Sequence, residues 1–204
     1  MLNEFRLYPN QYLSQEIRSF YHTGYLGFKK PGNPNFLNIL KNTYGNFRRD
    51  SLDHAAQELR NILSKDIPQI LEKASYPAMT VCVVPRAKSE ISYRPSQLLF
   101  KKTVYEACES LPVINGVDYI LRSTNTRTTH LPPNTPNYNN DGDMPYPGIT
   151  LDTCTISKNI QSCNILLIDD IYTGNVNIDE DMIQALLISG ATSVFFYAVG
   201  KTGG

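Results

Sequence analysis

The sequence lacks an excess of charge of either sign. Lys and Arg together number 19, and Asp and Glu together also number 19, so the formal net charge at pH 7 is zero. Proteins that bind nucleic acid through its backbone usually carry a strongly basic surface. The neutral balance therefore argues against nucleic acid as a partner, and a clustered basic face with salt-dependent affinity would be needed to reverse that expectation.

Long apolar runs are also missing. The longest, at residues 165–168 and 194–199, are far shorter than the roughly 20 residues that a membrane-spanning helix needs. The first residues, MLNEFRLYPNQY, lack the basic start and apolar centre of a signal peptide. We therefore expect a cytoplasmic protein with no membrane partner.

Cysteine and histidine are scarce. The four cysteines show no C-x-x-C spacing, and the three histidines have no partner spacing typical of a metal site. A chain of 204 residues, of which 41% are hydrophobic, can bury a core without disulfides. We expect all four cysteines to be reduced and most of them to pack in the interior, and we expect no metal site built from side chains. The alternative is that the cysteines bind zinc.

Segments typical of strands and of helices alternate along most of the chain. Apolar segments predict strands at 79–85, 117–123, 149–156, 165–168 and 191–202, and helical spacing predicts helices at 50–65, 96–111 and 177–189. This order predicts an α/β fold with a mostly parallel sheet flanked by helices. We divide the chain into residues 1–75, called the N-terminal hood, and an α/β core at 76–204.

Two further features concern the surface of the molecule. Residues 130–148, HLPPNTPNYNNDGDMPYPG, contain five prolines and four asparagines and predict a long irregular loop, called the lid. The hood is rich in tyrosine, which combines apolar area with a polar tip and is common in interfaces. The hood could therefore form a homodimer or bind a partner protein, or its tyrosines could fill a loop-rich core.

The stretch NILLIDDIYTGNVNIDEDMIQALL carries the main candidate site. Its four aliphatic residues predict a buried strand, and the adjacent Asp169 and Asp170 are expected where that strand leaves the core. Residues 173–177 would then lead into a helix capped by Asn177, with Glu180 completing a capping box and Gly190 ending the helix. In open α/β sheets ligands bind at this edge, so we expect the ligand here.

This stretch resembles the motif of type I phosphoribosyltransferases, in which hydrophobic residues precede an acidic pair and a Thr/Gly turn that opens a helix. Upstream segments are similar to the ComF-like, amidophosphoribosyltransferase-like branch: VCVVPRAKSEISYRPSQLL around Pro85, Arg94 and Gln97, and YILRSTNTRTTHL around Arg122 and Thr126. The resemblance covers about residues 80–202.

The resemblance implies a ligand and a role for each matching residue. Asp169 and Asp170 would bind the ribose hydroxyls of phosphoribosyl diphosphate, or of a related nucleotide, and would be the catalytic pair. The 5′-phosphate and diphosphate would be bound by Thr173, Gly174, Asn175, Val176, Asn177, Arg86, Lys88, Arg94 and Arg122. Mg²⁺ would bridge the diphosphate and ribose oxygens, and the protein would transfer the phosphoribosyl group to an unidentified acceptor while the lid excludes water.

The sequence departs from the family pattern at the phosphate loop. The family loop usually runs Thr-Thr-Gly-x-Thr, whereas this chain has Thr-Gly-Asn-Val-Asn at 173–177, so two hydroxyl donors are lost. Asp179, Glu180 and Asp181 also crowd the first helical turn, where each would repel a phosphate unless it points outward. The alternative interpretation is an inactive member of the fold that acts as a nucleotide-sensing, regulatory or interaction subunit.

Overall fold

A mostly parallel sheet forms the centre of the computed structural model, which describes residues 1–27, 30–129, 131, 134–136, 138–144 and 149–203. The six strands lie in the order β1 (Asn3–Leu7), β2 (Ile17–Tyr25), β8 (Ser193–Thr202), β7 (Asn164–Tyr172), β3 (Thr80–Val83) and β4 (Ile114–Asn115). Every neighbouring pair is parallel except β1 and β2. The predicted α/β class and mostly parallel sheet are confirmed.

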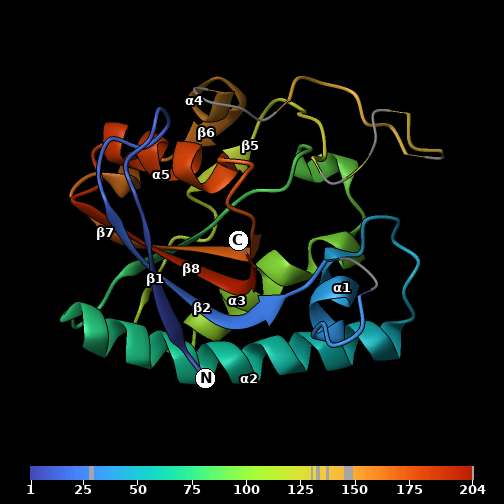
Figure 1. Cartoon of the computed structure of the whole chain (residues 1–204), viewed down its shortest axis with the longest axis horizontal. Helices are drawn as coiled ribbons and strands as arrows, with labels where there is room; N and C mark the ends of the chain where they lie inside the picture. The colour runs from blue at the N-terminus through green and yellow to red at the C-terminus, as the bar shows by residue number, and fades with distance from the viewer. Residues whose placement is uncertain (28–29, 130, 132–133, 137, 145–148, 204) are drawn as a thin grey trace.

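Helices cover both faces of this sheet (Figure 1). One face packs against α1 (Asn35–Lys41), α2 (Arg49–Ala74) and α3 (Leu99–Cys108), and the other against α5 (Ile178–Ile188). Side chains of β7 alternate between the two cores, with Leu166 on the α2 side and Leu167 on the α5 side. A strand buried on both faces accounts for the uninterrupted apolar run in the sequence.

The N-terminal region is built into the sheet and the layer of helices on one face. β2 pairs in parallel with β8, and β1 pairs with β2, so residues 1–75 supply two of the six strands. α2 is longer than the predicted 50–65, and its N-cap residue is Arg48, which makes no side-chain cap. The part of this region nearest the predicted ligand site is the end of α1.

The segment between α3 and β7 differs most from expectation. The predicted strand at 117–123 forms β5 (Ile120–Arg122), which pairs antiparallel with β6 (Cys154–Ile156) in a separate small sheet. The predicted strand at 149–156 is wrong in its first half, which forms α4 (Ile149–Thr153). Short 3-10 helices complete the fold at η1 (Glu90–Ser92), η2 (Pro95–Gln97) and η3 (Lys158–Ile160).

Across the residues with described positions, no helix is both long and apolar enough to cross a membrane. All four cysteines are free thiols, and three of them are buried, as the sequence predicted.

Candidate functional site

A cavity of about 440 Å³ lies at the carboxyl ends of β3 and β7. Its wall is completed by the end of α1, the start of α3, the segment after β5 and the first turn of α5. Four carboxylates and five basic side chains line it: Glu90, Asp169, Asp170, Asp179, Lys41, Arg86, Lys101, Arg122 and Arg127. Glu90 is paired with Lys101 at 2.5 Å. The remaining wall is largely apolar and includes Val83, Val84, Leu98, Phe100, Ile171, Val176 and Ile178.

Asp169 and Asp170 lie at the point where β7 loses one of its two neighbours. Pairing with β3 ends at Ile168, whereas pairing with β8 continues, with Asp169 opposite Ala198. The strand itself runs on to Tyr172, so the predicted strand end at the acidic pair is wrong by several residues. The pair nevertheless lines the cavity, because the loss of β3 exposes this part of β7.

A third carboxylate joins the pair from the first turn of α5. Asp179 is only 5% exposed, and no donor from the described part of the chain reaches its Oδ1 atom. Burial and the neighbouring Asp170 raise the pKa of Asp169 to about 8, and burial and Asp169 hold the pKa of Asp179 well above its ordinary value. The raised pKa values of these two neighbouring carboxyl groups favour a proton shared between Asp169 and Asp179 at neutral pH.

The other two acids of this helical turn also point inward. Glu180 accepts a hydrogen bond from the Tyr172 hydroxyl at 2.9 Å, and Asp181 accepts one from the Thr150 hydroxyl at 2.5 Å. Both are buried, as is Asp179, so the suggestion that these acids point away from the protein is wrong. The predicted capping box is absent too, because Asn177 makes no side-chain cap and lies in the left-handed region with φ of 56°.

Only part of the predicted phosphate loop reaches the cavity. Thr173 and Val176 line it, whereas Gly174 and Asn175 are exposed and lie outside its wall. The side chain of Asn177 is turned to the N-terminal region, where its Oδ1 accepts a hydrogen bond from Asn10 at 3.4 Å. The loop therefore presents a single hydroxyl side chain to the cavity, that of Thr173.

The opposite end of the cavity contains a buried arginine. Arg122 is 5% exposed and donates to the main-chain oxygen of Arg86 at 3.2 Å and to the Thr153 hydroxyl at 2.5 Å. No carboxylate of the described residues forms an ion pair with it, and burial lowers its pKa. A buried cation without an anionic partner favours the binding of an anion from solution.

Arg86 is held rigidly beside Arg122. Its Nη1 atom donates to the main-chain oxygens of Lys41 at 2.7 Å and Gln97 at 2.9 Å, and its guanidinium lies 4.7 Å from the ring centre of Tyr93. These contacts fix the side chain against the wall and leave its charge unpaired by any described carboxylate. An arginine positioned in this way loses little conformational freedom when it binds an anion.

Arg127 belongs to the same group, and the sequence analysis missed it. It follows Thr126, lines the cavity, and has a buried Nε atom with no hydrogen-bond partner in the described structure. The amide and the hydroxyl of Thr126 both donate to the main-chain oxygen of Ala87, so neither donor is available to a ligand. One basic residue in an otherwise polar loop gives no sequence pattern that could have singled it out.

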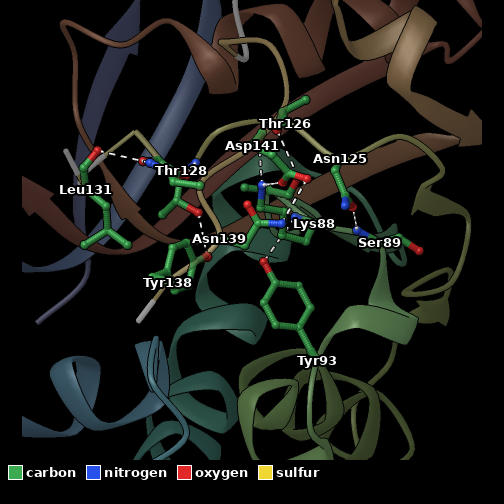
Figure 2. Close-up of polar contacts among 12 residues, drawn as sticks. Lys88, Ser89, Tyr93, Asn125, Thr126, Thr128, Leu131, Tyr138, Asn139 and Asp141 are labelled. Atoms are coloured by element: carbon green, nitrogen blue, oxygen red, sulfur yellow. Dashed lines mark hydrogen bonds and ion pairs between the residues drawn. The ribbon is translucent and has the colours of Figure 1, made fainter. Parts of the chain in front are cut away.

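Two predicted ligands of the diphosphate lie outside the wall of the cavity. Lys88 is buried and donates to the carboxylate of Asp141 at 2.5 Å and to its main-chain oxygen at 2.6 Å, while its own amide donates to the Tyr93 hydroxyl (Figure 2). Arg94 is exposed and begins η2, where its amide donates to Gln97.

The described part of the lid is attached to the rim of the cavity through the ion pair of Lys88 with Asp141 and through hydrogen bonds to Thr128. Tyr138 and Thr128 hydrogen bond through their hydroxyls at 2.8 Å, and Asn140 accepts from the amide of Thr128 at 2.7 Å (Figure 2 shows the first of these contacts). Of the residues predicted to form the lid, His130 and residues 132–133, 137 and 145–148 lie outside the described residues.

A metal would have to be bound largely by the ligand. No group of three or more His, Cys, Asp or Glu side chains among the described residues is arranged to hold a metal ion. Mg²⁺ commonly binds through one or two carboxylates together with substrate phosphates. The acidic pair suits that role in combination with a diphosphate.

Comparison of the chain with protein-family models and with curated proteins gave no match.

Proposed function

We propose that the cavity binds the sugar phosphate part of phosphoribosyl diphosphate or of a related nucleotide. The observation that carries this proposal is the division of charge within one cavity, with carboxylates at the end of β7 and unpaired arginines opposite. Carboxylates accept hydrogen bonds from a ribose diol, and guanidinium groups donate to phosphate oxygens. Asp169 and Asp170 bind the diol, and Arg86 and Arg122 bind the phosphates on the anomeric side.

Mg²⁺ enters with the ligand in this proposal. Asp169 and Asp170 would hold the metal together with the diphosphate, whose charge the metal would neutralise, and the arginines would donate to the phosphate oxygens. Transfer of the phosphoribosyl group to an acceptor would then depend on positioning and on stabilisation of charge at the anomeric carbon. The apolar wall around Phe100 and Val83 leaves room for an acceptor ring beside that carbon.

The second candidate is a protein of the same fold that binds the ligand without turnover. The observation that favours it is the buried acid Asp179 at the head of α5, together with a phosphate loop of which Gly174 and Asn175 lie outside the cavity. Such a protein would sense the ligand or act as a regulatory subunit. Binding with no consumption of phosphoribosyl diphosphate in the presence of candidate bases would favour this alternative.

Calorimetric titration with phosphoribosyl diphosphate and with ribose 1-phosphate, each with and without Mg²⁺, tests the shared proposal. The control is the double variant Asp169→Asn/Asp170→Asn, which keeps the shape of the acidic pair and removes its charge. Binding of either compound that is lost in the variant supports a sugar phosphate site. No binding of either at millimolar concentration would contradict it.

A further inference from the structure

The end of the cavity at α5 has few side chains that could donate hydrogen bonds to a phosphate, and none that is basic. Its wall here consists of the aliphatic side chains Val176 and Ile178, the carboxyl group of Asp179 and one hydroxyl, that of Thr173. No basic side chain belongs to α5 or to residues 173–177. Among the described side chains, an anion placed here would find one neutral donor, the Thr173 hydroxyl, beside apolar side chains, and would otherwise depend on main-chain N–H groups.

Charge at this end is unfavourable for an anion as well. Asp169, Asp170 and Asp179 line the same part of the cavity, and Lys41 lies 3.9 Å from Asp170 as the single basic side chain paired with them in the described structure. Even with one proton shared between two of these carboxyl groups, the cluster keeps negative charge. A phosphate dianion would be repelled over a short distance and through a poorly hydrated medium.

Asp179 has the opposite requirement, because it needs a hydrogen-bond donor. Its side chain is 5% exposed, it lines the cavity, and its Oδ1 atom receives no hydrogen bond from another described residue. A buried oxygen without a donor is costly, and a ligand hydroxyl that reaches it would remove that cost. This side chain therefore distinguishes a hydroxyl from a phosphate at the same position.

We propose that the α5 end of the cavity binds a hydroxyl group in preference to a phosphate, so that a ribosyl 1-phosphate or 1-diphosphate with a free 5-hydroxyl binds more tightly than its 5-phosphorylated counterpart. This inference rests on the proposed function, which assigns the diol to Asp169 and Asp170 and the anomeric phosphates to Arg86 and Arg122. Arg127 adds a further unpaired donor at the phosphate end. The preferred ligand then carries its negative charge only on the anomeric phosphates.

The test compares ribose 1-phosphate with ribose 1,5-bisphosphate by calorimetry at pH 7.5. The two compounds differ only in the 5-phosphate, and the bisphosphate places one phosphate at α5 in either orientation. We expect ribose 1-phosphate to bind at least tenfold more tightly. Equal or tighter binding of the bisphosphate would overturn this inference and leave the proposed function standing, whereas no binding of either compound or of phosphoribosyl diphosphate would overturn both.

Three variants give an independent reading of the same point. Asp179→Asn keeps nearly the same side-chain volume, and Val176→Thr returns a hydroxyl to the loop. Each should lower the ratio of the affinity for ribose 1-phosphate to that for ribose 1,5-bisphosphate by severalfold. Asn175→Ala should leave the ratio unchanged, because Asn175 lies outside the cavity. A loss of bisphosphate affinity in Asn175→Ala, or an unchanged ratio in both other variants, would overturn the inference.

Discussion

The two ends of the cavity differ in how their buried charges are satisfied. At the arginine end, Arg122 is buried and donates hydrogen bonds only to neutral groups among the described residues, so an anionic ligand would help to balance its charge. At the α5 end, Asp169 and Asp179 reduce their charge by retaining a proton. One end therefore keeps its charge available for a ligand and the other reduces its charge, which is why we assign the anomeric phosphates to the arginine end.

The largest expected effect is on the arginine end. Arg122→Met removes the buried guanidinium at similar length, and we expect it to weaken binding of ribose 1-phosphate by about 100-fold, since a hydrogen-bonded charge is worth roughly 1.5–3 kcal/mol. Calorimetry measures this loss. Stability should stay the same or rise, because Arg122 has no ion pair to break among the described residues.

Arg94→Met is the matched control, since Arg94 is exposed and lies outside the cavity. We expect it to change the affinity by less than about twofold, within the range of an exposed charge. A strong loss of stability in Arg122→Met, or equal loss of affinity in both variants, would show that the arginine end has no special role in binding.

Asp179 at the α5 end can be compared with Asp66, a buried aspartate whose carboxylate has hydrogen-bond partners. Asp66 is 2% exposed and contacts the hydroxyl of Tyr197 and Nδ1 of His22, each at 2.8 Å. Asp66→Asn should cost about 1–2 kcal/mol of unfolding free energy, because it disturbs these hydrogen bonds. Asp179→Asn should be neutral or stabilising, because its amide can donate to Asp169.

Urea denaturation of both variants measures this difference. The slope of unfolding free energy against urea should match the wild-type protein, so that only the midpoint moves. Destabilisation of Asp179→Asn by as much as Asp66→Asn would mean that Asp179 is a structural residue with an undetected donor, and our contrast between the two ends would fail.

The raised pKa values predict that stability falls as pH rises. Aspartate in the unfolded chain titrates near pH 4, whereas Asp169 in the folded protein retains its proton up to about pH 8. The folded state therefore binds more protons in this window, and its unfolding free energy decreases with increasing pH, by about 3 kcal/mol between pH 5.5 and pH 8. Urea unfolding at pH 5.5 and pH 8 measures the change, which Asp169→Asn should reduce; a flat profile would contradict the shared proton.

The sequence predicted the fold class because its signals are local and repeated. The apolar run before Asp169 is continuous since β7 is buried on both faces, and α5 ends at Ile188, shortly before Gly190, whose φ is 98°. The strand expected at 149–156 failed for a non-local reason. Thr150 bonds to Asp181 on α5, and this tertiary contact accompanies a helical turn where local composition favoured a strand.

The candidate site was predictable in part. Asp169, Asp170, Arg86 and Arg122 all line one cavity; the first three follow predicted strands, and Arg122 lies near the end of one. Asp179 was noted only as a source of repulsion, because helical spacing gave no indication that its side chain turns inward. Which cations remain unpaired also depends on long-range contacts, as the separation of Lys88 and Asp141 along the chain illustrates.

The smallest expected effect concerns Lys88. Its ammonium group already contacts the carboxylate of Asp141, which holds the pKa of that carboxyl below its ordinary value, and it lies outside the cavity wall (Figure 2). We therefore expect Lys88→Met to change the affinity for ribose 1-phosphate by less than about threefold, in contrast to Arg122→Met, since a cation that is already paired has little attraction left for a ligand. Calorimetry on Lys88→Met and on Lys88→Met/Asp141→Asn measures the effect. A loss comparable to that of Arg122→Met would mean that Lys88 exchanges Asp141 for the ligand and belongs to the arginine end.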